Sequence, residues 1–154
     1  MKALTIHQPW ATLIMLGLKP VENRSCRYKH RGPLLIHAGR STEFMSVIHD
    51  PAFRNYAALL SAQPPLPFGC ILGQVTVIDC LSAEEYRYHF GDDQWVAGPF
   101  CLVLENPIRL AHPIAYRGQQ GLFTIDDQKY ARLIDDQFCR CSGLPTSEEL
   151  AHEK

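Results

Sequence analysis

Three charged residues of both signs lie within six positions of one another near the start of the chain. They are Lys19, Glu22 and Arg24, in the run Gly17-Leu-Lys-Pro-Val-Glu-Asn-Arg24. Charges this dense beside an apolar segment usually pair, and pairing inside a cleft is typical of functional sites. The alternative is a surface ion pair, which would contribute little to stability.

Each of these side chains has a chemical and a structural interpretation. Lys19 could bind a phosphate, stabilise an oxyanion or act as a base, or it could be a solvated lysine that follows a helix. Glu22 could activate a water or accept a hydrogen bond from the exocyclic amine of a cytosine, and a structural salt bridge explains it equally well. Arg24 could hold a phosphate through two hydrogen bonds or orient Glu22.

The hydrophobic pattern predicts the elements that position this run. Residues 3–6 form a strand, and Pro9 is typical of the start of a helix, here one with apolar residues up to Leu18. Residues 20–24 form a second extended segment. If it is a strand, Glu22 and Arg24 point to the same face.

The rest of the chain predicts short strands separated by helices and turns. Further strands are expected at residues 34–38, 70–81, 100–105, 108–114 and 121–125. Helices are expected at about residues 42–61 with a break at Asp50-Pro51, after a capping box at Ser82 and Glu85, and at 126–138. Asn106-Pro107 is predicted to be a turn that leaves 108–114 at a sheet edge, and Gly73 to mark a bulge.

Composition limits the fold and the class of function. The 154 residues suit one compact domain, with 46% apolar and 20% charged residues. We predict an α+β fold: a small, partly open β-barrel surrounded by short helices, with a domain at 1–138 and a polar tail at 139–154. No segment is long and apolar enough to cross a membrane, and we expect a cytoplasmic protein.

The net charge and the spacing of the cysteines limit the classes of partner and bound group that we expect. A net charge of −1 argues against binding of duplex nucleic acid through a broad basic surface. Residues 24–40 are nevertheless rich in cations and contain no acid. The six cysteines include no C-x-x-C pair, and Cys139 and Cys141 lack further ligands, so we expect reduced thiols, no metal site and no cofactor.

With these residues placed, the chain resembles the ASCH domain family of the PUA-like superfamily. The matching segments are Leu4-Thr-Ile-His-Gln-Pro-Trp10, G-x-K-x-x-E-x-R at Gly17 to Arg24, Gly32 to Ala38, Gly73 to Cys80 and Gly118-x-x-Gly-Leu-Phe123. The resemblance implies a β-barrel with a cleft that carries the lysine motif and faces RNA or a nucleotide. Some members of the family hydrolyse N4-acylated cytidine, and a ribonuclease activity has been described for others.

One departure from the amidohydrolase members affects the mechanism. Those members resemble this chain at Lys19 but carry a threonine, the proposed nucleophile, at the position of Glu22. That covalent mechanism therefore does not transfer to this chain, and Glu22 would have to activate a water instead.

Several other residues are candidates for binding, each with a structural alternative. Trp10 and Tyr28 could stack on bases, but a tryptophan on an apolar helix is more often a core residue, and Tyr28 could be part of a solvated loop. His37 lies in an apolar strand, where a hydrogen-bonded core histidine is the commoner case. The full set of candidate binding residues beside Lys19 and Glu22 is His7, Gln8, Trp10, Arg24, Tyr28, Arg31 and His37.

These observations give a primary hypothesis and two alternatives. The first is a domain that binds RNA, another single-stranded nucleic acid or a modified nucleoside in a cleft built around Lys19, Glu22 and Arg24. The second is a metal-independent amidohydrolase acting on N4-acylated cytidine-type nucleosides, with Glu22 as base and Lys19 as oxyanion stabiliser. A ribonuclease that uses His7 or His30 with Lys19 ranks below both.

Overall fold

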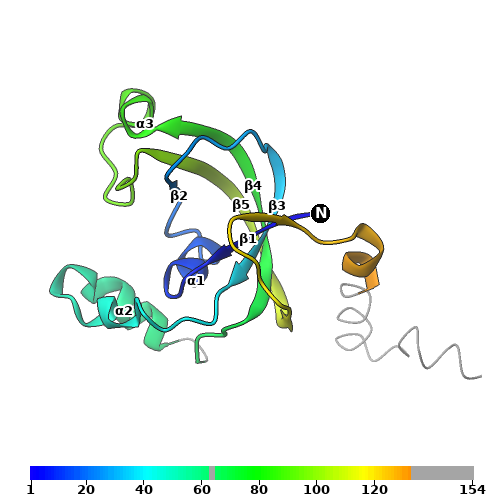
Figure 1. Ribbon diagram of the computed structural model, residues 1–154. Coiled ribbons are helices and arrows are strands. Elements are labelled where there is room, and N and C mark those ends of the chain that lie inside the picture. Colours follow the sequence, from blue (N-terminus) through cyan, green and yellow to red (C-terminus); the bar gives the residue numbers. More distant parts are fainter. Residues whose placement is uncertain (63–64, 133–154) are drawn as a thin grey trace, which may run out of the picture.

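One mixed six-stranded sheet, in the order β2-β5-β4-β3-β1-β6, forms the framework of the protein. The computed structural model describes residues 1–62 and 65–132. The strands are β1 Lys2–Ile6, β2 Val21–Arg24, β3 Gly32–Ala38, β4 Cys70–Ser82, β5 Phe100–Ala115 and β6 Leu122–Thr124. The sheet curves around helix α1 (Trp10–Met15), which packs against β3, β4 and β5 (Figure 1). The predicted α+β, barrel-like fold is confirmed.

The pairing of β1 brings distant parts of the chain to one edge of the sheet. β1 runs parallel to β3 and antiparallel to β6, whereas all other neighbouring strands are antiparallel. The segment before β6, residues 117–121, is therefore held beside the ends of β1 and β3. At the other edge, β2 pairs with residues 100–103 of β5.

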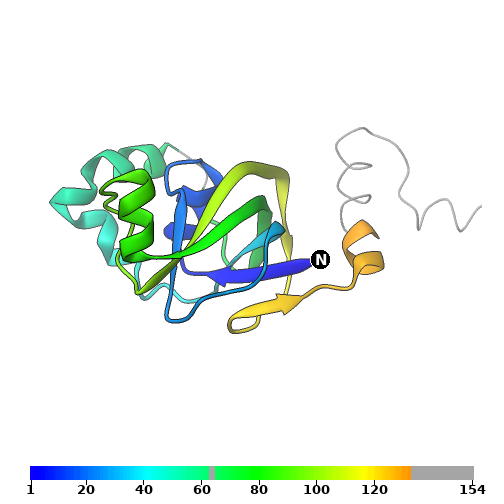
Figure 2. The same ribbon diagram turned by 90° about the horizontal axis from the view of Figure 1, so that it is seen from above.

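Short helices flank the sheet at its ends (Figure 2). The helix predicted at residues 42–61 is divided into two 3-10 turns, η1 (Met45–His49) and η2 (Pro51–Phe53), and α2 (Arg54–Ser61). Asp50 caps η2 by accepting from Ala52 N, which explains the break at Asp50-Pro51. The capping box of α3 (Ala83–Phe90) is present as predicted.

The predicted turn at Asn106-Pro107 is wrong. β5 is one continuous strand across these residues. Thr76 pairs with Glu105 and Gln74 with Ile108, so two residues of β5 lie opposite one residue of β4. Such a bulge accommodates the positive φ of Asn106 and the missing N–H of a proline without ending the strand.

The bulge predicted at Gly73 is present. The pairing of β4 with β3 and with β5 shifts register beside this residue. A Cβ at Gly73 would lie 2.6 Å from Met15 Cε and closer still to a carbonyl of β5, so the crowded backbone here requires a glycine.

The main core fills the space between α1 and the concave face of the sheet. Leu4, Ile14, Leu34, Ile36 and Val75 are buried there. Residues 127–132 are helical, and the predicted tail 139–154, with Cys139 and Cys141, lies outside the described residues. Within the described part of the chain, no helix has both the length and the apolar character needed to span a membrane.

Candidate functional site

Lys19, Glu22 and Arg24 form one ion-paired group. Lys19 Nζ donates to the carbonyl oxygen of Val21 and to Glu22 Oε2, which is 2.9 Å away. Arg24 Nη2 donates to Glu22 Oε1, also at 2.9 Å. Lys19 is only 4% exposed, so the interpretation as a solvated lysine is wrong.

The local backbone fixes the positions of these three residues. Gly17, with φ of +73°, ends α1, and the amides of Leu18 and Lys19 both donate to Leu13 O. β2 then pairs with β5, and strand alternation places Glu22 and Arg24 on the same face, as predicted. The charged group is thus held by a helix end and a strand.

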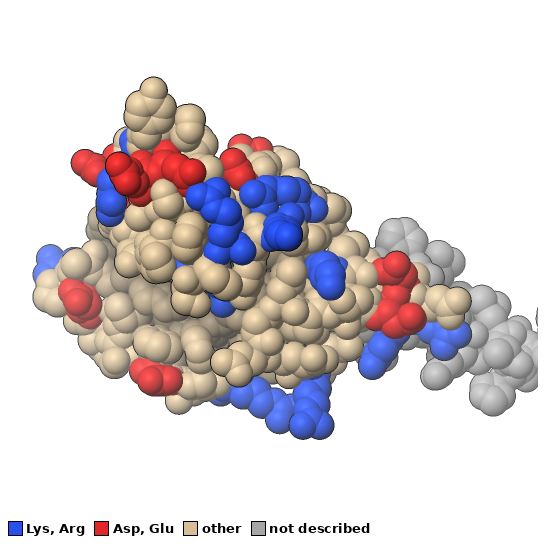
Figure 3. Space-filling view, turned by 45° about the horizontal axis from the view of Figure 1, so that its top comes forward, with Lys and Arg blue, Asp and Glu red and all other residues tan. Residues whose placement is uncertain are grey.

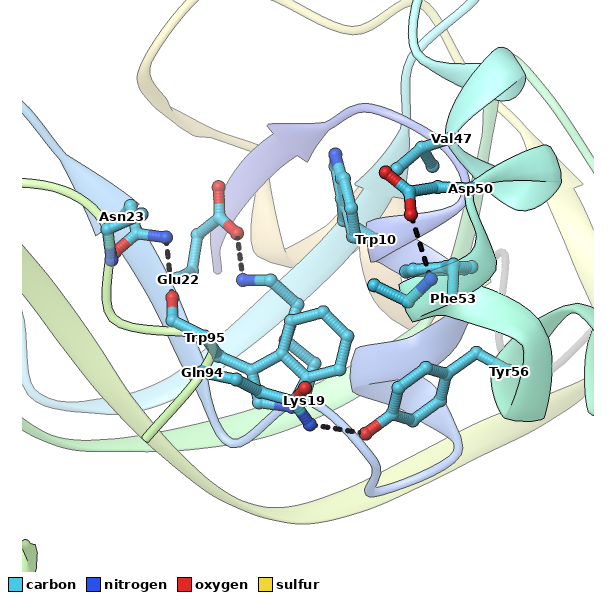
Figure 4. A pocket seen from close by; sticks show the side chains of 12 residues that line it. Trp10, Lys19, Glu22, Asn23, Val47, Asp50, Phe53, Tyr56, Gln94 and Trp95 are labelled. Atoms are coloured by element: carbon cyan, nitrogen blue, oxygen red, sulfur yellow. Dashed lines mark hydrogen bonds and ion pairs between the residues drawn. The ribbon is translucent and has the colours of Figure 1, made fainter. Parts of the chain in front are cut away.

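A cavity of about 450 Å³ opens beside Lys19 and Glu22 (Figure 4). We call it the aromatic cavity. Its lining residues are Trp10, Lys19, Glu22, Asn23, Val47, Asp50, Ala52, Phe53, Tyr56, Gln94, Trp95 and Ala97. Four of them carry aromatic rings, which come from α1, the η2–α2 segment and the loop before β5.

The rings of the aromatic cavity pack on one another. Trp10 meets Phe53 and Trp95 edge to face, with centroids 5.4 and 5.9 Å apart, and Tyr56 lies 5.0 Å from Trp95. Asn23 holds the loop between α3 and β5 in place through hydrogen bonds. Its Nδ2 donates to Trp95 O, and its Oδ1 accepts from the amides of Ala97 and Gly98. These contacts form a preorganised apolar wall.

A second cavity, of about 670 Å³, adjoins the first. We call it the arginine cavity. Its lining residues are Thr5, Ile6, His7, Trp10, Glu22, Arg24, His37, Gly39, Arg40, Arg117, Gly118, Gln119, Gln120 and Gly121. Trp10 and Glu22 line both cavities, so these two side chains stand where the cavities meet.

Buried His37 positions the wall of the arginine cavity formed by residues 117–121. Its Nε2 lies 3.0 Å from Tyr116 O, and because a carbonyl oxygen only accepts, this nitrogen carries a proton and donates it. Thr5 Oγ1 donates to Gln119 O at 2.8 Å. Burial lowers the pKa of His37, opposed by the hydrogen bond to Tyr116 and reinforced by the nearby charge of Arg40. His37 is therefore a neutral anchor for this loop at neutral pH.

Positive charge is concentrated in the arginine cavity. Three arginines line it against one carboxylate, Glu22, which is already paired with Lys19 and Arg24. Among the described residues, neither Arg40 nor Arg117 forms a salt bridge. Figure 3 shows that, on the face in view, Lys and Arg side chains lie at several separate places with Asp and Glu side chains among them. The near-neutral net charge thus conceals a local cationic site.

Most of the candidate residues from the sequence meet at these cavities. Lys19, Glu22, Arg24 and Trp10 surround the junction, and His7 and His37 line the arginine cavity. Tyr28 lies at its edge: Arg24 Cζ is 6.0 Å from the ring centroid, and a Cβ at Gly121 would be 3.8 Å from the tyrosine hydroxyl.

Besides Tyr28, two further candidate residues, Gln8 and Arg31, line neither cavity. Gln8 is fully buried. Its Nε2 donates to Pro67 O, and its Oε1 accepts from Thr12 N. Arg31 pairs with Asp79 on the surface and donates to the carbonyl oxygens of Tyr28 and His30. Both side chains have structural partners in place of a position in the cleft.

Sequence reasoning missed most of the residues that line each cavity. It did not select Phe53, Tyr56 or Trp95, although a tryptophan in the polar run Gly91-Asp-Asp-Gln-Trp95 is a detectable signal. It also did not assign Arg40 and Arg117 to the cleft, because nothing in their spacing reveals that β4 brings the ends of β3 and β5 together, with Cys70 opposite both Ala38 and Ala115.

Comparisons with known proteins identify the family. The family model for the ASCH domain matches residues 4–125. The chain belongs to the ASCH domain family. This ASCH domain is 32% identical over 130 residues to human activating signal cointegrator 1 and 33% identical over 129 residues to the mouse protein. Each match covers 81% of this chain but 22% of the relative, so the chain spans about a fifth of their length.

A solved structure supports the same fold. The crystal structure of ASCH from Zymomonas mobilis aligns with a TM-score of 0.56 at 12% identity, covering 86% of this chain and 92% of that one. At this identity the likeness concerns the fold. Among residues 1–62 and 65–132, no three His, Cys, Asp or Glu side chains come close enough together to hold a metal ion.

Proposed function

We propose that this ASCH domain binds single-stranded RNA or a nucleotide in the cleft formed by the two cavities. One observation carries the proposal: Trp10 and Glu22 join a cavity lined by aromatic rings to a cavity lined by arginines. Nucleic acids combine apolar base faces with anionic phosphates, and proteins that bind single strands present aromatic platforms beside cationic grooves.

The ion-paired group suits recognition of a base edge. Two of the three ammonium protons of Lys19 are used by Val21 O and Glu22, which leaves one donor for a ligand in the aromatic cavity. Glu22 retains further lone pairs that can accept from an exocyclic amine. A carboxylate and an ammonium side by side can therefore read donor and acceptor groups of one base.

The charge distribution favours single strands over duplexes. The net charge is −1, and the cations of the cleft lie in a concave site. Duplex binding requires a broad basic surface that contacts many phosphates. A concave site with few cations suits a short single strand or one nucleotide.

Anisotropy of a labelled single-stranded RNA hexamer tests this function. We expect saturable binding that Trp95→Leu weakens by about tenfold or more, since stacking of one base contributes about 1–3 kcal/mol. The matched control is Tyr88→Leu, which removes an aromatic ring that is 86% exposed on α3 and lines neither cavity. Absence of binding to hexamers of any composition and to all four mononucleotides would refute the proposal.

A metal-independent amidohydrolase is the second candidate. The observation in its favour is the contact of Lys19 with Glu22 at 2.9 Å on the wall of a cavity large enough for a nucleoside. Glu22 would take a proton from a water that attacks the acyl carbon, and Lys19 would stabilise the resulting oxyanion. The proton would then pass to the departing amine.

Turnover of N4-acetylcytidine separates this candidate from simple binding. The hydrolase predicts release of acetate and cytidine that is unaffected by a chelator and abolished in Glu22→Gln. If the nucleoside binds without turnover, the site is a binding site only.

A further inference from the structure

We propose that the cleft divides its ligand, with the base in the aromatic cavity and a phosphate in the arginine cavity. The ligand is then a phosphorylated nucleotide unit, within a strand or as a mononucleotide, and not a free nucleoside. This inference rests on the proposed function and assigns each half of the site to one part of the ligand.

The aromatic cavity is unfavourable for a phosphate. Its one cation, Lys19, already donates to Glu22 and to a backbone carbonyl. Two carboxylates, Glu22 and Asp50, line the same cavity. A phosphate placed there would meet more negative than positive charge, whereas the faces of Trp10, Phe53 and Trp95 suit a base.

The arginine cavity has the opposite character. Arg40 and Arg117 line it without a salt bridge to any described carboxylate, and Arg24 uses Nη2 for Glu22. His7 adds a further donor at the end of β1. Arginines hold phosphate oxygens through paired, charge-assisted hydrogen bonds, so these side chains provide an anion site.

The wall that carries Arg117 is built into the fold. His37 is 1% exposed and bonds Tyr116 O on one side of this arginine, while Thr5 bonds Gln119 O on the other. Gly118 lies directly against the imidazole: a Cβ there would be 2.6 Å from His37 Nδ1 and 2.8 Å from Thr5 Oγ1. The backbone beside Arg117 is thereby fixed before a ligand arrives, which lowers the entropic cost of binding.

The two cavities are joined where a nucleotide needs them to be. Trp10 and Glu22 belong to both linings, so a ligand can pass from one cavity to the other across these side chains. This division places the phosphate at Arg40 and Arg117, whereas the sequence suggested Lys19 or Arg24 as its partner. Lys19 and Glu22 remain with the base.

Calorimetry with matched ligands tests the division. Each of the four ribonucleosides is compared with its 5′- and 3′-monophosphate, using the full chain and the variants Arg40→Ala, Arg117→Ala and the double variant. The control is Arg54→Ala, which removes an exposed arginine of α2 that lines neither cavity. Inorganic phosphate serves as a competitor.

We expect at least one monophosphate to bind about tenfold or more tightly than its nucleoside, and the double variant to remove this advantage without weakening the nucleoside. Arg54→Ala should preserve the advantage, and inorganic phosphate should compete with the monophosphate only.

Two results overturn the inference in distinguishable ways. Equal affinity for nucleoside and monophosphate, or an advantage that survives the double variant, refutes the division but leaves the proposed function in place. If the unmodified chain binds no nucleoside, no monophosphate and no RNA hexamer, the proposed function fails together with the inference.

Discussion

The ammonium of Lys19 lies 2.9 Å from Glu22 Oε2, and the other oxygen of the same carboxylate lies 2.9 Å from Arg24. One acidic side chain therefore pairs with two cations that are largely withdrawn from water. The three residues form a single electrostatic unit, and removing different members of it has unequal consequences.

Glu22→Gln is expected to lower the free energy of unfolding by about 3 kcal/mol, because it leaves two largely buried cations without a counter-charge. Lys19→Met should cost less, about 1 kcal/mol, because Glu22 keeps Arg24 as its partner. Urea denaturation measures both. Glu84→Gln, at an exposed carboxylate of α3, is the control. A larger loss from Lys19→Met than from Glu22→Gln contradicts the account.

Gly118→Ala is expected to destabilise the protein by about 2 kcal/mol, because the added methyl group collides with a buried imidazole that has no room to move. Gly39→Ala is the matched control. It lines the same cavity, but its Cβ would meet Thr5 Cγ2 at an acceptable 3.4 Å. Thermal unfolding compares the two variants, and equal losses would show that the packing against His37 does not matter.

Stability is expected to fall on acidification below about pH 6.5 because of His37. Its pKa in the folded protein is lowered from 6.5 by burial, so the unfolded chain takes up this proton first. The contribution of the neutral ring is complete above pH 6.5 and is lost as the pH falls toward the folded pKa.

Unfolding free energies measured between pH 8 and pH 5 test this effect. His37→Gln keeps a donor toward Tyr116 O but cannot take up a proton, so its curve should be flatter than that of the unmodified chain. Parallel curves for the two proteins would exclude His37 as the source of the pH dependence.

One fast-reacting thiol is expected among the described cysteines. Cys26 is exposed, whereas Cys70, Cys80 and Cys101 are buried, and burial raises the pKa of Cys101 to about 11. In a Cys139→Ser/Cys141→Ser background, a thiol reagent should modify one cysteine per chain until the protein unfolds. Rapid modification of a second thiol in the folded protein would contradict the burial of these side chains.

Local sequence signals predicted most of the elements correctly. Alternation placed Glu22 and Arg24 on one face of β2, and the capping box at Ser82 and Glu85 marked the start of α3. One exception is β5, where Asn106-Pro107 is typical of a turn. The strand nevertheless continues through these two residues, which form a bulge opposite β4.

Apart from His37, the cavity-lining residues that sequence reasoning selected lie within one short stretch of the chain, residues 7–24. Lys19, Glu22 and Arg24 are close along the chain, and so is Trp10. Trp95 and Arg117 reach the cleft through long-range pairing of β2 with β5 and of β1 with β3 and β6, which no local pattern specifies. Gln8 and Arg31 were selected as binding residues because their types suit recognition, but hydrogen bonds within the fold engage both side chains.

The indole signals of Trp10 and Trp95 provide the most direct test of the central claim. They are the two tryptophans of the chain, and both line the aromatic cavity. In an NMR titration with a ribonucleoside 5′-monophosphate, we expect both indole N–H signals to shift along saturating curves with one shared Kd. Indole signals that stay unmoved while other resonances saturate, or that do not respond to any of the four nucleotides, would contradict the placement of a base in this cleft.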